Sequence, residues 1–157
     1  MIETVSVSGM KIACAFDHAG LPLRDAVLGA VTAAGHEPID MGVRSPEPVD
    51  YPDVARKVGR AIDTGVADRG VLVCGSGAGV SVAATKIHGV RAATIHDEYT
   101  AHQAVEHDGV NVLCLGARVV GEALAQEIVS RFLAAEVSGD ERHVRRREKL
   151  DQIEAEN

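Results

Sequence analysis

The sequence predicts an α/β protein of three layers, in which a parallel five-stranded sheet lies between two layers of helices. Three observations lead to this prediction. Five short apolar runs alternate with segments of helical periodicity along the 157 residues. Several runs are almost continuously apolar, as expected for strands that are covered on both faces. Strands that alternate with helices in this way favour a parallel sheet with helices on both sides.

The five expected strands follow one another at regular distances. Their sequences are KIACAFD, EPIDMG, RGVLVCG, RAATIH and VNVLCLG, at residues 11–17, 37–42, 69–75, 91–96 and 110–116. Five such strands suit a Rossmann-like, flavodoxin-like sheet with the strand order 2-1-3-4-5. Sheets of this kind bind ligands beyond the carboxyl ends of their strands, at the switch between the first and third strands.

Helical segments connect these strands. The first, at residues 21–34, places Leu23, Val27 and Val31 on one stripe and stops at Gly35, a residue type that commonly ends helices. The last, a charged extra helix, is expected near the C-terminus. This extra helix is expected at residues 140–155, and the other helical segments at residues 52–64, 78–86, 98–107 and 121–135.

Length and composition indicate one cytoplasmic domain. We expect residues 1–157 to form a single domain, with residues 1–10 as an N-terminal extension. The hydrophobic content is 46%, but aromatic residues make up only 3%, so the core must be aliphatic. A net charge of −7 argues against a nucleic-acid partner. The sequence shows no secretion signal and no run long enough to span a membrane, so we expect no membrane partner.

One cysteine stands at the mouth of a glycine-rich turn, in the stretch VLVCGSGAGVS at residues 71–81. The three cysteines show no C-x-x-C spacing, which favours reduced thiols over a zinc site or disulfides. Cys14 and Cys114 lie inside apolar runs and are predicted to be structural, whereas Cys74 ends its run. A cysteine at the start of a helix can serve as nucleophile or base, and Ser76 can hold the thiol's proton or orient the substrate. The alternative is a third buried structural cysteine.

The glycine-rich turn after Cys74 predicts a site for an anion. Its backbone N–H groups can point into one concavity. The turn matches neither a Walker A motif nor G-x-G-x-x-G, because no Gly-Lys-Ser/Thr follows and position 80 is valine. A tight turn before a closely packed helix explains the glycines equally well. The residues that supply these N–H groups are Gly75, Gly77, Ala78 and Gly79.

Other polar residues carry possible chemistry. Asp17 and His18 follow the first run, where they can bind hydroxyl groups or move protons, although Asp17 is also a typical helix cap. His107 lies between the fourth helix and the fifth strand. Arg142 and Arg146 are four residues apart, so they share a helical face that can bind phosphate. A solvated face with internal ion pairs is the alternative for that helix.

Taken together, these segments resemble the ribose-5-phosphate isomerase B family, which includes the galactose-6-phosphate isomerase subunits. The resemblance runs from about Lys11 to the end of the chain, with the motifs in family order and spacing. It implies interconversion of aldose and ketose phosphates through a cis-enediolate, without a metal or another cofactor. The matching segments are FDHAG (16–20), DYP (50–52), CGSGAGVSVAATK (74–86), EH (106–107), NVLCLGARVVG (111–121) and RHVRR (142–146).

The resemblance implies roles for individual residues. Cys74 matches the base that moves a proton between C1 and C2, and Ser76 matches a residue that assists it. His107 matches the histidine that helps to open the furanose ring. The backbone amides of the glycine-rich turn would stabilise the enediolate oxyanion. The substrate-binding residues implied are Asp17, His18, Tyr51, Gly75, Gly77, Ala78, Gly79, Asp108, Arg118, Arg142 and Arg146.

The resemblance also implies a homodimer whose active sites draw residues from both chains, and in some members a tetramer. The charged helix at residues 140–155 would then reach the partner. Two positions depart from the family pattern. The usual His-Asn pair is His107-Asp108 here, and the usual Ala-Asn-Lys has Thr85 in its centre. Because the asparagine of the His-Asn pair normally faces the sugar, Asp108 makes a neutral contact a charged one.

The predicted reaction is therefore the interconversion of ribose 5-phosphate and ribulose 5-phosphate in the pentose phosphate pathway. One alternative is another substrate, such as erythrulose 4-phosphate, to which the departure at Asp108 points. A second is a sugar-phosphate-binding protein of the same fold without catalysis. A third, a flavin-binding protein, is disfavoured by the scarcity of aromatic residues for stacking.

Overall fold

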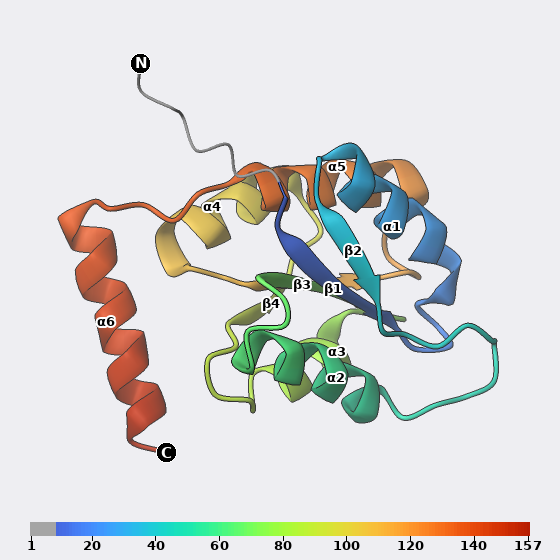
Figure 1. Cartoon of the computed structure of the whole chain (residues 1–157), viewed down its shortest axis with the longest axis horizontal. Helices are drawn as coiled ribbons and strands as arrows, with labels where there is room; N and C mark the ends of the chain where they lie inside the picture. Colours follow the sequence, from blue (N-terminus) through green and yellow to red (C-terminus); the bar gives the residue numbers. More distant parts are fainter. Residues whose placement is uncertain (1–8) are drawn as a thin grey trace.

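Five segments form the strands of one parallel sheet in the computed structural model, which describes residues 9–157 (Figure 1). All neighbouring strands pair in parallel. The predicted three-layer α/β/α, Rossmann-like class is therefore confirmed. Most of the N-terminal extension expected at residues 1–10 lies outside the described residues. The strands are β1 (Lys11–Phe16), β2 (Glu37–Asp40), β3 (Arg69–Cys74), β4 (Ala92–Thr94) and β5 (Val112–Gly116).

The strand order is β2-β1-β3-β5-β4, so the prediction 2-1-3-4-5 was wrong in its last two positions. Burial explains the exchange. Every residue of β5 is buried, which suits an interior strand, whereas β4 has only three residues, and none of them is fully buried. A short, partly exposed strand belongs at the edge of a sheet. The exchange places the loop that follows β5 beside the end of β3.

Helices cover both faces of the sheet (Figure 1), and the strand side chains alternate between these two helical layers. Cys14 and Phe16 face the layer of α1, α4 and α5, while Ala13 and Ala15 face α2 and α3. Cys74 and Cys114 face the α2–α3 layer, and all three cysteines are buried. A 3₁₀ turn at Leu21–Leu23 leads into the first helix. The helices are α1 (Arg24–Ala33), α2 (Tyr51–Asp63), α3 (Ala78–Ala84), α4 (Glu98–Asp108) and α5 (Glu122–Ala134).

The C-terminal helix α6 (Glu141–Ala155) differs from the others, because it lies outside the three layers (Figure 1). His143 is its only buried residue. Asp140 caps its start by accepting a hydrogen bond from the N–H of Arg142 at 3.1 Å. A helix with so little buried surface gains little stability from its own chain. Within residues 9–157, no helix combines the length and the apolar character needed to cross a bilayer.

Candidate active site

A cavity of about 380 Å³ lies at the carboxyl ends of β1 and β3, where the sequence predicts the ligand site. The structure brings eight of the predicted site residues together here. Two more, Gly77 and Ala78, belong to the turn beside it. The lining residues are Asp17, His18, Ala19, Tyr51, Cys74, Gly75, Ser76, Gly79, Arg118 and Val119.

Cys74 is the last residue of β3, and its side chain reaches the cavity although the residue is only 5% exposed. The backbone N–H of Gly77 donates a hydrogen bond to its Sγ at 3.1 Å. This bond fixes the sulfur at the mouth of the glycine-rich turn. The other two cysteines differ, since burial raises the pKa of Cys14 to about 12 and also raises that of Cys114. Only the thiolate is a base or nucleophile, so these two are structural, as predicted.

The glycine-rich turn needs glycine at position 77. Gly77 has a φ of +80°, and an added Cβ would lie 2.9 Å from the carbonyl carbon of Leu115. The N–H groups of Gly77 and Ala78 are already bonded, to Sγ of Cys74 and Oγ of Ser76. Within residues 9–157, the N–H groups of Gly75, Ser76 and Gly79 donate to no protein acceptor, so they are free for a ligand oxygen.

Asp17 and His18 are held in fixed orientations at the end of β1. Oδ1 of Asp17 accepts hydrogen bonds from the N–H groups of Ala19 and Gly20, at 2.9 and 2.8 Å. Asp17 therefore caps the turn through Oδ1, and Oδ2 is the carboxylate oxygen that takes part in neither of these bonds. Nδ1 of His18 accepts a hydrogen bond from the N–H of Val49 at 3.1 Å. The proton of a neutral His18 is therefore assigned to Nε2, which becomes a donor for a ligand.

A cation and an aromatic ring flank the glycine-rich turn. The backbone N–H of Arg118 donates to the carbonyl of Gly75 at 3.0 Å, and Nη1 of Arg118 is 3.2 Å from where a Cβ of Gly75 would stand. The ring of Tyr51 comes within 3.0 Å of the equivalent point on Gly79. Side chains at these two glycines would therefore displace the guanidinium or the ring.

Two supporting residues had no predicted role. Thr94 Oγ1 donates a hydrogen bond to the carbonyl of Gly77 at 2.7 Å, and Nε2 of His96 accepts one from the N–H of Gly116 at 2.9 Å. Burial lowers the pKa of His96, which keeps it in the neutral form that can accept this bond. Thr94 ends β4 and His96 follows it, at the sheet edge where the sequence already places polar residues. Their contacts depend on the true strand order.

The remaining predicted residues, His107, Asp108, Arg142 and Arg146, form a second group that does not line the Cys74 cavity. The reason is topological. Helix α4 starts beyond the carboxyl end of β4 and runs back, so it ends near the start of β5, at the opposite edge of the sheet. There the ring of His107 stacks on that of His143, with 4.0 Å between centroids and 26° between planes.

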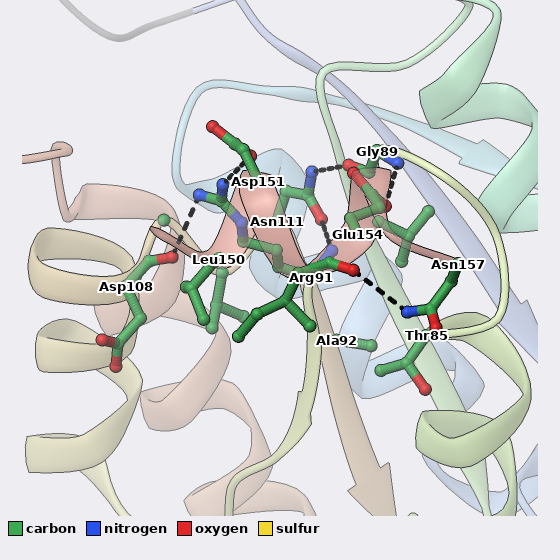
Figure 2. Close-up of a pocket in the computed structure, with 14 residues that line it drawn as sticks. Thr85, Gly89, Arg91, Ala92, Asp108, Asn111, Leu150, Asp151, Glu154 and Asn157 are labelled. Atoms are coloured by element: carbon green, nitrogen blue, oxygen red, sulfur yellow. Dashed lines mark hydrogen bonds and ion pairs between the residues drawn. The ribbon is translucent and has the colours of Figure 1, made fainter. Parts of the chain in front are cut away.

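A larger groove of about 760 Å³ lies between α6 and the beginnings of β4 and β5 (Figure 2). Of the predicted site residues, only Asp108 lines it, and the groove contains no cysteine or histidine. We therefore take the smaller Cys74 cavity as the candidate active site. Thr85, the other departure from the family pattern, also lines the larger groove, at the opposite end from Asp108 in Figure 2.

Comparisons with known proteins agree with this geometry. The family model described as Ribose/Galactose Isomerase matches residues 12–150. Ribose-5-phosphate isomerase B of Escherichia coli is 41% identical over 144 residues, which cover 92% of this chain and 96% of that protein. D-erythrulose-4-phosphate isomerase of Pectobacterium atrosepticum is 37% identical over 132 residues, which cover 83% of this chain and 86% of that protein.

Solved structures give the same result. Type B ribose 5-phosphate isomerase of Trypanosoma brucei has a TM-score of 0.89 at 44% identity, covering 92% of this chain and 99% of that one. Ribose-5-phosphate isomerase B of Mycoplasma genitalium, solved with bound ribulose-5-phosphate, has a TM-score of 0.88 at 37% identity, covering 96% of this chain and 99% of that one. The resemblance seen in the motifs therefore extends over nearly the whole chain and its fold, and the chain belongs to the Ribose/Galactose Isomerase family.

Proposed function

We propose that this protein interconverts ribose 5-phosphate and ribulose 5-phosphate, with Cys74 as the catalytic base. One observation carries the proposal. Cys74 is held by the Gly77 N–H at the mouth of a turn whose lining residues Gly75, Ser76 and Gly79 keep free amides beside the same small cavity. Family relatives that carry the name ribose-5-phosphate isomerase B support this choice of substrate. We place the enzyme in the cytoplasm and in the pentose phosphate pathway.

The proposed reaction moves one proton between neighbouring carbons. The thiolate of Cys74 removes the proton from C2 of the open-chain aldose, and the electron pair moves through C1 to the carbonyl oxygen. The resulting cis-enediolate carries negative charge on that oxygen, where the free N–H groups of Gly75, Ser76 and Gly79 can stabilise it. The hydroxyl proton on O2 then moves to O1, and the Cys74 thiol returns its proton to C1, which gives the ketose.

Ser76 suits the transfer between the two oxygens. Its Oγ accepts the N–H of Ala78 at 3.2 Å, which leaves the hydroxyl proton free to be donated to a substrate oxygen. Asp17 and His18 supply an acceptor and a donor for sugar hydroxyls, and Arg118 supplies a positive charge at the same cavity. No step of this scheme uses a metal, so we expect activity to survive chelation.

We further propose a homodimer with shared active sites. His107, Arg142 and Arg146 have the chemistry for ring opening and phosphate binding, but their own chain places them at the opposite edge of the sheet. A second copy that presents the end of α4 and the start of α6 to the Cys74 cavity would supply them. The small buried surface of α6 supports this arrangement, since the helix has exposed surface for a partner. Pairs of dimers would form a tetramer.

A four-carbon substrate is the second candidate. Asp108 carries a negative charge where the family has a neutral asparagine, and relatives named D-erythrulose-4-phosphate isomerase match this chain at 37% identity. The two candidates share the same base and the same proton transfer. They differ in the length of the sugar, so turnover measurements distinguish them directly.

The test compares kcat/KM for ribose 5-phosphate and erythrulose 4-phosphate in the presence of a chelator. We expect ribose 5-phosphate to lead by more than about tenfold, roughly 1.4 kcal/mol of transition-state preference. Cys74→Ala should lower kcat by roughly 10³-fold or more, since the base is lost. Cys14→Ala is the matched control, because that thiol lies in the opposite core layer. Binding of both sugars without turnover would leave the non-catalytic alternative in place.

A further inference from the structure

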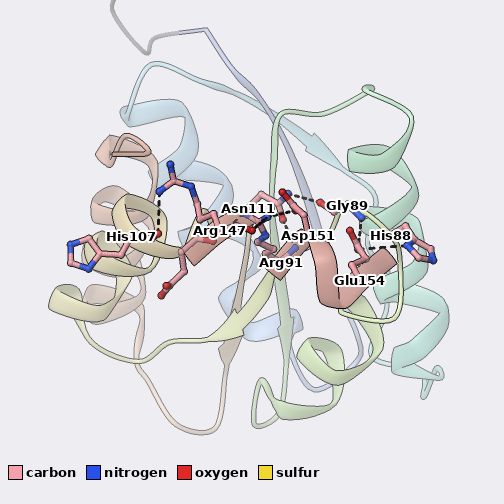
Figure 3. A network of polar contacts seen from close by, with 9 residues as sticks. His88, Gly89, Arg91, His107, Asn111, Arg147, Asp151 and Glu154 are labelled. Atoms are coloured by element: carbon pink, nitrogen blue, oxygen red, sulfur yellow. Dashed lines mark hydrogen bonds and ion pairs between the residues drawn. The ribbon is translucent and has the colours of Figure 1, made fainter. Parts of the chain in front are cut away.

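Two arginines cap the C-terminal end of α4 (Figure 3). Nη1 of Arg147 donates to the carbonyl oxygen of His107 at 3.1 Å, and Nη1 of Arg91 donates to that of Asp108 at 3.3 Å. The last carbonyls of a helix lack partners within the helix, and they carry its negative dipole end. Both guanidinium groups therefore stabilise the turn of α4 that carries His107.

Gly109 makes room for these arginines. It ends α4 with a φ of +67°, and an added Cβ would lie 2.7 Å from Nη1 of Arg91 and 3.1 Å from Cδ of Arg147. A larger residue here would push the two guanidinium groups off the helix end. The left-handed conformation also favours glycine at this position.

The same arginines attach α6 to the body of the protein. Arg147 also donates to the carbonyl of Ser138 through Nη2, at 2.6 Å, and Arg91 forms an ion pair with Asp151 on the next turn of α6. Nη2 of Arg91 also reaches the carbonyl of Arg147, at 3.5 Å. We call Arg91, Arg147 and Asp151 the clasp. It joins the start of β4, the end of α4 and the middle of α6 (Figure 3).

The ring of His107 is held from α6 as well. His143 is only 5% exposed, and its Nδ1 lies 3.0 Å from Oγ of Ser138. Its ring stacks on that of His107. The backbone of His107 is therefore fixed by Arg147, and its ring by His143, which lies four positions before Arg147 on α6. That helix also carries Arg142 and Arg146.

We propose that the clasp is a positioning device, which holds His107 at a fixed place relative to Arg142 and Arg146. The inference rests on the proposed function, in which these three residues enter the partner's cavity together. The clasp touches no reacting atom. Its effect is that the ring-opening histidine and the phosphate-binding arginines move as one unit, because all of them are anchored through α6. Small displacements of such groups lower turnover strongly.

The main test compares Arg147→Ala with Arg145→Ala. Arg145 is exposed on the same helix and makes no hydrogen bond or ion pair with residues 9–157, so its removal takes away the same charge without breaking the clasp. We expect Arg147→Ala to lower kcat/KM for ribose 5-phosphate by roughly tenfold or more. Arg145→Ala should stay within about twofold of wild type. Arg147→Lys should recover part of the loss, because one ammonium can reach one carbonyl.

The split between kcat and KM separates positioning from a purely structural role. Displacing His107 and the arginines together should lower kcat and raise KM in Arg147→Ala. Binding of ribitol 5-phosphate, which has no carbonyl to isomerise, should weaken in parallel with the rise in KM. A clasp that only stabilises the fold would lower the melting temperature of Arg147→Ala but leave its kinetics at 25 °C equal to those of Arg145→Ala, and that result would overturn the proposal.

Asp151→Asn provides a second variant if Arg147→Ala does not fold. It removes the ion pair with Arg91 but leaves both hydrogen bonds of Arg147 to the carbonyls, so a smaller loss of kcat/KM is expected. Unchanged kinetics in both Asp151→Asn and Arg147→Lys would also contradict the clasp. A wild-type enzyme that isomerises neither ribose 5-phosphate nor erythrulose 4-phosphate would contradict the proposed function instead. The two failures therefore remain distinguishable.

Discussion

The Cys74 cavity and the end of α4 are built in different ways. Around Cys74, backbone bonds tie the turn to the next loop, with the N–H of Ala117 donating to the carbonyl of Cys74 at 2.9 Å. At the end of α4, side chains do the equivalent work, since Arg91 and Arg147 reach the last carbonyls from other elements. The base is therefore carried by the sheet, and the second group by the end of α4 together with α6, a helix whose surface is largely free.

This difference suggests a division of tasks. Proton transfer between neighbouring carbons requires a base that is fixed within a fraction of an ångström. Ring opening and phosphate binding act on more distant parts of the sugar, and a helix seated on a partner chain can supply them. Turnover by such a protein should therefore depend on dimerisation, whereas the Cys74 cavity should form in each chain by itself.

The largest expected effect comes from mixing two inactive variants. Cys74→Ala and His107→Asn should each be nearly inactive with ribose 5-phosphate. In a mixed dimer with shared sites, one site carries both changes and the other carries neither. Co-expression in equal amounts should therefore restore about one quarter of wild-type activity, from random pairing of the two chains in a symmetric dimer. The measurement is the specific activity of the purified mixture.

The control for this experiment mixes each variant with itself, which should restore nothing. A mixture that stays inactive while mass analysis shows mixed dimers would mean that His107 acts within its own chain. The topology of α4 argues against its own chain, since that chain places Cys74 and His107 at opposite edges of the sheet.

Much of the Cys74 cavity was predictable from sequence, because most of its residues lie at or just after strand ends. A cysteine that ends an apolar run and precedes three glycines must stand at the carboxyl edge of a parallel sheet. The exchange of β4 and β5 was missed, although the sequences carry a signal for it. VLCLG is continuously apolar, as an interior strand should be, while AAT is short and weakly apolar.

The clasp could not be found from sequence. Arg91 and Arg147 are 56 residues apart, and each stands among ordinary charged or apolar neighbours. Only the packing of α6 across the ends of α4 and β4 brings them together. Gly109 offered only a partial signal. A glycine there indicates the end of a helix, but such glycines are common and do not reveal what packs against them.

A smaller, substrate-dependent effect is expected for His107→Asn. In a four-carbon sugar 4-phosphate, the phosphate occupies the hydroxyl that would close a furanose ring, so the sugar stays open. Ribose 5-phosphate closes through its 4-hydroxyl and must be opened before the proton transfer. His107→Asn should therefore lower kcat/KM for ribose 5-phosphate by roughly 10²-fold, the usual range for general acid–base catalysis, and change that for erythrulose 4-phosphate much less.

Parallel assays of the two sugars provide the measurement for His107→Asn, with Cys74→Ala as the reference variant. Loss of the base should lower turnover of both sugars together, because both need the same proton transfer. Equal losses for both sugars in His107→Asn would contradict a ring-opening role and would point to binding or positioning instead.

The smallest expected effect is on stability in acid, and it involves both regions. His96 supports the Cys74 cavity and His143 supports His107, and burial is the main cause that lowers the pKa of each. For His143, the neighbouring charges of His107 and Arg142 lower the pKa further. When the folded-state pKa lies below the unfolded value of about 6.5, the unfolded chain binds protons first as the pH falls.

The stability contributed by these neutral histidines is therefore complete above pH 7 and is lost as the pH falls below about 6.5. We expect the melting temperature to fall by a few °C between pH 7.5 and pH 5.5, above the range where most carboxylates titrate. His96→Asn should flatten this dependence, because an amide oxygen can accept the Gly116 N–H at either pH. An equal slope in wild type and His96→Asn would assign the acid sensitivity to His143 or to His36, because burial lowers the pKa of both.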